Sequence, residues 1–187
     1  EYLRGFITFA YKTGWRLGEI SELTWDKVDL KQRVVLLDPG DAKNDEPRTV
    51  VVDDEVLEVL NRQWKLRGKP GKILPFVFLN AKGSDRIKQF GKSWKTACED
   101  AKIGKRLFHD FRRSAVRNMV RAGVPERVAM TISGHKTRSV FERYNVVSEE
   151  DLRNASQKQS AYLDSLRGHN LGTIVDLKEK GANRCSG

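Results

Sequence analysis

Cysteine, histidine and long apolar runs are scarce in this chain of 187 residues. The two cysteines, Cys98 and Cys185, lie far apart, which excludes a disulfide framework and a four-ligand zinc site and favours a reducing cytoplasm. His109, His135 and His169 and the scattered carboxylates show no metal-ligand spacing, so we expect neither a metal nor another cofactor. No apolar run is long enough to cross a bilayer, and no signal peptide opens the chain.

Acidic residues are also outnumbered. The 25 aspartates and glutamates face 35 lysines and arginines, which gives a net charge of +10. Such a surplus attracts polyanions, of which nucleic acid is the commonest. Charge alone does not separate a nucleic-acid ligand from a basic surface that serves solubility. The length is sufficient for one ample domain with a real core.

The spacing of apolar residues changes along the chain between helical and extended patterns. We expect an α+β fold, mainly helical, with one small antiparallel sheet. Two β-rich stretches joined by turn formers predict a hairpin, and a short third strand follows them. The predicted strands are 28–37, 48–52 and 76–79, and the predicted helices are 2–13, 18–25, 54–67, 87–101, 109–122, 125–132, one from 138 that carries Tyr144, and 148–166.

The predicted helix 109–122 carries the densest pattern. His109 and Arg112 are three residues apart, so their side chains are neighbours at the edge of an apolar stripe. A basic stripe follows the same helix at four-residue spacing. It is equally compatible with contacts to DNA phosphates and with a solvated face. The apolar stripe is Phe108, Phe111, Ala115 and Met119, and the basic stripe is Arg113, Arg117 and Arg121.

Four further local patterns complete a set of residues suited to phosphoryl transfer. Its transition state requires fixed positive donors at the non-bridging oxygens, and the planar guanidinium of arginine supplies two at once. A tyrosine hydroxyl can act as the nucleophile once a base accepts its proton. The patterns are Thr13-Gly14-Trp15-Arg16-Leu17-Gly18-Glu19-Ile20, Lys43 in the hairpin link, Ser133-Gly134-His135, and Tyr144 nine residues after His135.

In this order, the patterns resemble the catalytic domain of tyrosine recombinases of the phage integrase family, over roughly residues 1–166. The chain departs from the family in two places, with Ser133 where leucine is more usual and Ala42 where threonine is more usual. The resemblance implies a fold similar to the catalytic domain of type IB topoisomerases. It also implies a tail at 167–187 and an amino-terminal DNA-clamping domain outside this chain.

The resemblance also implies a role for each residue. Arg16 and Arg112 would hold the scissile phosphate while Tyr144 attacks it, forming a 3′-phosphotyrosine without ATP or metal. His109 would accept the tyrosine proton or form a hydrogen bond to the phosphate, and His135 would form a hydrogen bond to a non-bridging oxygen. Lys43 would give a proton to the leaving oxygen, and Glu19 would orient Arg16 or the neighbouring backbone.

A site-specific DNA recombinase is the function that this resemblance implies. It would act on double-stranded DNA as a homotetramer, in a bacterial or phage-host cytoplasm close to the nucleoid. Three other interpretations remain open at this point. They are a type IB topoisomerase-like enzyme, a catalytically silent DNA-binding module built on the helix–glycine–helix stretch 109–133, and a metal-dependent nuclease.

Overall fold

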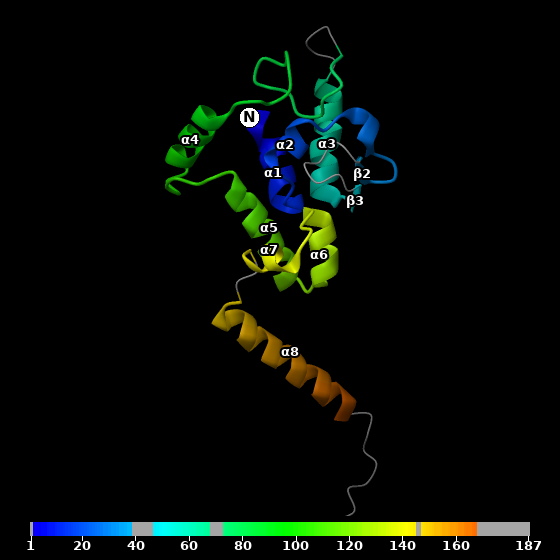
Figure 1. Ribbon diagram of the computed structural model, residues 1–187, viewed down its shortest axis with the longest axis vertical. Coiled ribbons are helices and arrows are strands. Elements are labelled where there is room, and N and C mark those ends of the chain that lie inside the picture. Colours follow the sequence, from blue (N-terminus) through cyan, green and yellow to red (C-terminus); the bar gives the residue numbers. More distant parts are fainter. Residues whose placement is uncertain (1, 39–46, 68–72, 145–146, 168–187) are drawn as a thin grey trace, which may run out of the picture. The chain divides into compact units, whose positions relative to one another are not determined.

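The computed structural model of the protein describes residues 2–38, 47–67, 73–144 and 147–167. The chain divides into two compact units, residues 1–146 and 147–187. Figure 1 shows a mainly helical first unit with one small sheet, as the sequence predicted. Its elements are α1 (Tyr2–Thr13), α2 (Leu17–Ser21), the 3-10 helix η1 (Trp25–Lys27), β1 (Val28–Asp29), β2 (Val34–Leu37), β3 (Arg48–Val51), α3 (Asp54–Leu66), α4 (Gly91–Asp100), α5 (His109–Arg121), α6 (Glu126–Ser133) and α7 (Arg138–Glu142).

The sheet has three antiparallel strands in the order β1-β2-β3. The predicted strand 28–37 is divided, because the Asp29 carboxylate accepts hydrogen bonds from the backbone N–H groups of Lys31 and Gln32 and closes a turn. Arg33 completes this turn with a positive φ of 58°. Val35 pairs with Val50 in the second hairpin, whose link lies outside the described residues.

The predicted third strand at 76–79 is absent as a regular strand from the described residues. Phe76 and Leu79 each form only an isolated bridge, to Thr24 and Arg86. The physical reason is burial, because Val77 and Phe78 are consecutive and both 1% exposed. A strand with one buried face alternates inward and outward side chains, and this segment does not. The third strand of the sheet is β1 instead.

The main core is organised around α1. Phe6 and Phe9 are fully buried, and both make edge-to-face contacts with Phe78 at ring-centroid distances of 5.5 and 5.7 Å. Trp15 follows the helix and packs edge-to-face on Phe9. Its indole Nε1 donates a hydrogen bond of 3.0 Å to the backbone oxygen of Ile132, which ties the start of α2 to the end of α6. This packing places the first arginine pattern beside Gly134.

A second, smaller apolar cluster joins α5, α6 and α7. Its buried members are Val116, Ala129 and Phe141, and Tyr144 packs against them. Helix α7 is shorter than predicted, so Tyr144 lies in a turn two residues beyond it, with its N–H bonded to the Phe141 oxygen. We call residues 136–144 the tyrosine arm.

The second unit contains α8 (Glu149–Arg167), which begins where the sequence predicted. Ser148 and Asp151 form a reciprocal capping box, because the Asp151 carboxylate accepts from the Ser148 N–H at 2.9 Å and the Ser148 hydroxyl accepts from the Asp151 N–H at 3.3 Å. Neither α8 nor any other helix in the described ranges combines the length and the apolar character needed to span a bilayer.

Candidate active site

Arg16 immediately precedes α2, and Glu19 lies in the first turn of that helix. The buried Glu19 carboxylate accepts hydrogen bonds of 2.8 Å from both the Arg16 backbone N–H and the Arg16 Nη1. The Arg16 side chain remains about one-third exposed (32%), whereas that of Glu19 is 3% exposed. A buried carboxylate therefore aims a guanidinium whose outer surface still meets solvent.

Arg48 is a further cation at this site that the sequence analysis did not identify. It opens β3 at an inward-facing position, with its side chain only 6% exposed, and its Nη2 lies 2.6 Å from Glu19 Oε1. Its guanidinium also lies 5.2 Å from the centroid of the Trp15 ring. The sequence contained one signal for the burial of Arg48. Every second residue of a strand faces the same side, so Arg48 shares its face with the apolar Val50 and Val52. An arginine buried in this position requires a buried anion.

Gly134 makes this crowding possible. It ends α6 in the left-handed conformation, with φ at 69°, which favours glycine. A Cβ atom built on it would lie 2.0 Å from Arg48 Nη1. The Gly134 carbonyl faces the other two guanidiniums, with Arg16 Nη2 at 3.5 Å and Arg112 Nη2 at 3.4 Å. The two arginines predicted from separate patterns thus meet at one backbone oxygen.

Arg112 is 3% exposed and is held by several internal acceptors. Its Nη1 donates to the backbone oxygen of Gly14 at 2.7 Å and to that of Ser133, and its Nε donates to His135 Nε2 at 3.2 Å. Burial and the nearby charge of Arg16 lower the pKa of Arg112 to about 10, so it stays charged at neutral pH.

His135 is 6% exposed and lies between Arg112 and Ser133. The Ser133 hydroxyl is 2.7 Å from its Nδ1, opposite the contact with Arg112. Burial lowers the pKa of His135 to about 3, assisted by the positive charges of Arg112 and Arg16. The imidazole is therefore neutral at physiological pH. We call Arg16, Glu19, Arg48, Arg112 and His135 the cation cradle.

The cation cradle contains three guanidiniums against one carboxylate. Two of these guanidiniums belong to buried residues, where electrostatic interactions are screened less than on the surface. This excess positive charge is what lowers the pKa of both Arg112 and His135 beyond the effect of burial. The arrangement suits an anion with several oxygens, such as a phosphodiester.

Tyr144 reaches this region from the tyrosine arm. Its hydroxyl lies 2.8 Å from His109 Nε2, and its ring centroid is 5.1 Å from that of His135. Burial, followed by the charges of Arg112 and Arg113, lowers the pKa of His109. A neutral imidazole within hydrogen-bond distance can accept the phenol proton. The structure thus pairs a candidate nucleophile with a candidate base at the edge of the cation cradle.

The structure brings together Arg16, Glu19, His109, Arg112, His135 and Tyr144, all predicted from local patterns. Lys43 lies outside the described residues. The basic stripe of α5 is exposed on the surface. Within it, the Arg113 guanidinium lies 5.9 Å from the centroid of the Tyr144 ring, and Arg113 also pairs with Asp110 at 3.5 Å.

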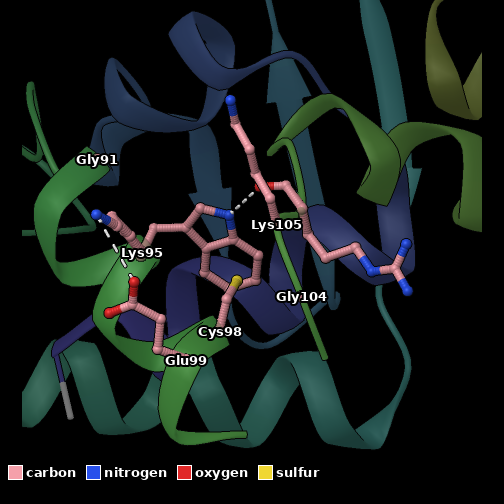
Figure 2. A pocket seen from close by; sticks show the side chains of 8 residues that line it. Gly91, Lys95, Cys98, Glu99, Gly104 and Lys105 are labelled. Atoms are coloured by element: carbon pink, nitrogen blue, oxygen red, sulfur yellow. Dashed lines mark hydrogen bonds and ion pairs between the residues drawn. The ribbon is translucent and has the colours of Figure 1, made fainter. Parts of the chain in front are cut away.

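A pocket of about 580 Å³ lies elsewhere, between α4 and the segment that follows it (Figure 2). Trp94 lines it and donates an indole hydrogen bond of 2.7 Å to the Arg106 backbone oxygen, and Cys98 lies buried in its wall. None of the predicted site residues lines this pocket. Across the part of the chain that the structure describes, no group of three or more His, Cys, Asp or Glu side chains is placed to hold a metal ion.

Comparison with known proteins identifies similar sequences and similar folds. The sequence model of the phage integrase family matches residues 1–151. The chain is 24% identical over 186 residues to the integrase of Salmonella phage P22, covering 96% of this chain and 47% of that protein. It is 29% identical over 162 residues to the tyrosine recombinase XerD of Mycobacterium leprae (strain TN), covering 80% and 49%. The chain therefore spans about half the length of these relatives.

Solved structures show the same fold. XerA recombinase superposes with a TM-score of 0.73 at 21% identity, over 84% of this chain and 58% of that one. XerH, bound to its difH substrate in a pre-cleavage complex, superposes with a TM-score of 0.63 at 19% identity, over 83% and 47%. At these identities the match concerns the arrangement of helices and strands.

Proposed function

Because the chain belongs to the phage integrase family, we propose that it is the catalytic part of a site-specific DNA recombinase that cuts and rejoins strands through a 3′-phosphotyrosine. One observation carries the proposal. The Tyr144 hydroxyl lies 2.8 Å from His109 Nε2 beside a cation cradle whose Arg16 and Arg112 point to the same carbonyl. This arrangement supports the proposal, because the proposed nucleophile, base and phosphate-binding groups lie close together.

The proposed chemistry starts with the transfer of the phenol proton to the neutral His109. The Tyr144 oxygen then attacks phosphorus, the bond to the 5′ oxygen breaks, and the phosphate stays linked to tyrosine through its 3′ side. Arg16 and Arg112 stabilise the charge that develops on the non-bridging oxygens. Lys43, in the hairpin link, protonates the departing 5′ oxygen. Because the ester preserves the free energy of the cleaved bond, religation uses neither ATP nor metal.

Double-stranded DNA is the proposed partner, supported by the net charge of +10 and by a relative, XerH, whose structure contains its DNA substrate. Arg113, Arg117 and Arg121 lie on the exposed face of α5. We assign them to sequence-independent contacts with the DNA backbone. Strand exchange between two duplexes cuts four strands, and each cut uses one Tyr144. We therefore propose a homotetramer as the working assembly, with residues 1–166 as the catalytic domain of each protomer.

The direct test is covalent trapping. The full-length protein is incubated with a pool of nicked duplexes with randomised cores, so that cleavage releases a short strand and prevents religation. We expect a covalent adduct that peptide mass spectrometry maps to Tyr144. Tyr144→Phe should abolish it, and His109→Gln should slow it about 10²–10⁴-fold because the base is lost.

Tyr162→Phe is the matched control, since Tyr162 is 63% exposed in α8 and is not among the predicted site residues. It should form the adduct at the normal rate. An adduct that persists in Tyr144→Phe would refute the mechanism. Plasmid relaxation without exchange between two duplexes would instead identify a topoisomerase-like enzyme, and cleavage that is lost in EDTA would identify a metal-dependent nuclease.

A further inference from the structure

The Glu19 carboxylate is shared between two arginines. Its Oε1 lies 2.8 Å from Nη1 of Arg16 and 2.6 Å from Nη2 of Arg48, and its Oε2 accepts the Arg16 backbone N–H at 2.8 Å. The Arg16 side chain is 32% exposed, whereas the Arg48 side chain is 6% exposed. One buried carboxylate therefore connects an arginine that can reach a ligand with an arginine that the protein encloses.

The surroundings of Arg48 hold its guanidinium in one place. The group lies 5.2 Å from the centroid of the Trp15 ring, and Trp15 is itself fixed by its indole hydrogen bond of 3.0 Å to the Ile132 oxygen. The guanidinium also fills the space beside Gly134, where a Cβ atom would meet Nη1, Cζ and Nε of Arg48 at 3.0 Å or less. A group enclosed in this way has little room to turn, so Nη2 stays directed at Glu19.

This burial of Arg48 is unfavourable for stability. Both of its Nη atoms are buried, and within the described ranges Nη1 has no hydrogen-bond acceptor. The contact of Nη2 with Glu19 is an ion pair that is not aligned as a hydrogen bond. An unsatisfied buried donor costs free energy, and apolar residues in place of a buried ion pair are often neutral or stabilising. Since Val50 and Val52 are buried on the same face, packing alone would favour an apolar residue here, and the charge of Arg48 calls for a functional reason.

We propose that Arg48 is a positioning residue that acts on the phosphate through Glu19 and Arg16. It fixes the carboxylate that orients Arg16, and its positive charge offsets the negative charge of Glu19. Without that offset, the carboxylate would cancel much of the attraction between Arg16 and a phosphate, because charges in a buried site are weakly screened. This role rests on the proposed recombinase function, and it adds a residue that none of the local sequence patterns contained.

Arg48→Met tests this role in the full-length protein. Methionine is apolar and unbranched, which suits the apolar neighbours of Arg48, and Glu19 keeps its contact with Arg16. The rate of adduct formation is measured against the concentration of a nicked duplex recovered from the pool, and is normalised to the final amount of adduct, which counts active molecules. We expect the maximal rate to fall about 10-fold, the order for removing one charge at an effective dielectric constant of about 20. The half-saturating concentration should change less than about 3-fold, because the other phosphates supply most of the affinity for DNA.

Two further variants separate charge from packing. Arg48→Lys keeps a positive charge beside Glu19 but loses the planar guanidinium, so it should restore the maximal rate to within about 3-fold of that of the unchanged protein. Arg86→Met is the matched control, because Arg86 also pairs with a glutamate, Glu22, at 2.8 Å and lies 5.9 Å from an aromatic ring, that of Phe76. Arg86 does not belong to the cation cradle, so its loss should leave the maximal rate unchanged.

The outcomes distinguish this role from the proposed function. If the unchanged protein forms no adduct at Tyr144, the function fails and the role of Arg48 fails with it. If the unchanged protein forms the adduct and Arg48→Met reaches the same maximal rate, the function stands and the positioning role is overturned. A loss of rate that Arg48→Lys does not restore would also overturn the role of the charge. If circular dichroism shows that Arg48→Met does not fold, Arg48→Gln, which is neutral but can still donate to Glu19, takes its place with the same expected results.

Discussion

The cation cradle and the tyrosine arm meet at the same site but are held very differently. In the cradle, Glu19, Arg48, Arg112 and His135 are all less than 8% exposed and bond to one another or to backbone oxygens. In the arm, residues 136–140 are exposed, and Phe141 is the buried anchor. Charge that must be in place before reaction is built into the core, whereas the proposed nucleophile is carried on a largely exposed segment anchored by Phe141.

This difference matches the requirements of the proposed chemistry. Electrostatic stabilisation is effective when donors do not have to reorganise during the reaction. A tyrosine that attacks and then remains bonded to DNA benefits from a segment that can open at low cost. If the comparison is correct, damage to the cradle should reduce global stability, and damage to the arm should remain local.

The largest effect is expected from Gly134→Ala in the cradle. A left-handed alanine costs about 1–2 kcal/mol. The new methyl group would also displace Arg48 from Glu19, and breaking a buried ion pair costs about 3–5 kcal/mol. We therefore expect a loss of more than about 3 kcal/mol in the free energy of unfolding, measured by urea denaturation.

Gly123→Ala provides a matched control. Gly123 also has a positive φ, at 80°, but nothing lies within 4 Å of a Cβ atom built there. It should lose only the backbone contribution of about 1–2 kcal/mol. If both variants lose the same free energy of unfolding, the Arg48 side chain moves aside without cost and the cradle is not rigid.

The case of Arg48 also shows how far the sequence could predict this site. Arg16 with Glu19, and His109 with Arg112, were found because helix periodicity makes residues three apart neighbours. Arg48 was missed because its partner Glu19 is distant in the chain, and only the folded sheet brings the two together. Ser133 was noticed as a departure from the family pattern. Its bond to His135 depends on the turn at Gly134, which residue types alone do not reveal.

The secondary structure shows the same contrast between what local patterns predict and what tertiary contacts decide. Helices with long apolar periods, such as α1, α3 and α5, were predicted nearly to the residue. The segment 76–79 was wrongly predicted as a strand because a short apolar run has no period that distinguishes a strand from an irregular buried segment. Its conformation is set by packing of Phe78 against α1, a tertiary contact that a local pattern does not contain.

An intermediate effect is expected from pH, again in the cradle. Burial lowers the pKa of His135 from 6.5 to about 3, so between these values the unfolded chain binds more protons than the folded one. Stability is therefore fully present above pH 6.5 and is lost progressively as the pH falls. From pH 7 to 5, linkage gives a loss of about 2 kcal/mol from this residue.

His135→Gln removes the titrating group and should flatten the dependence over this interval, even if the variant is less stable at pH 7. The measurement is urea unfolding at both pH values for the two proteins. If the free energy of unfolding falls equally in both proteins between pH 7 and pH 5, then His135 is protonated in the folded state at pH 5.

The smallest effect is expected from Thr137→Ala in the tyrosine arm. Thr137 caps α7 by accepting the Val140 N–H at 3.4 Å, and removing a cap of this length costs about 0.5–1 kcal/mol. Because the arm opens locally, the backbone amides of Phe141 and Tyr144 should exchange with solvent about 2–5-fold faster, with unchanged exchange in α5. The control is Thr131→Ala, since the Thr131 hydroxyl donates to a carbonyl of its own helix, at 2.9 Å. If Thr137→Ala instead lowered protection throughout α5 and α6, the arm would be part of the cooperative core, and the contrast with the cradle would disappear.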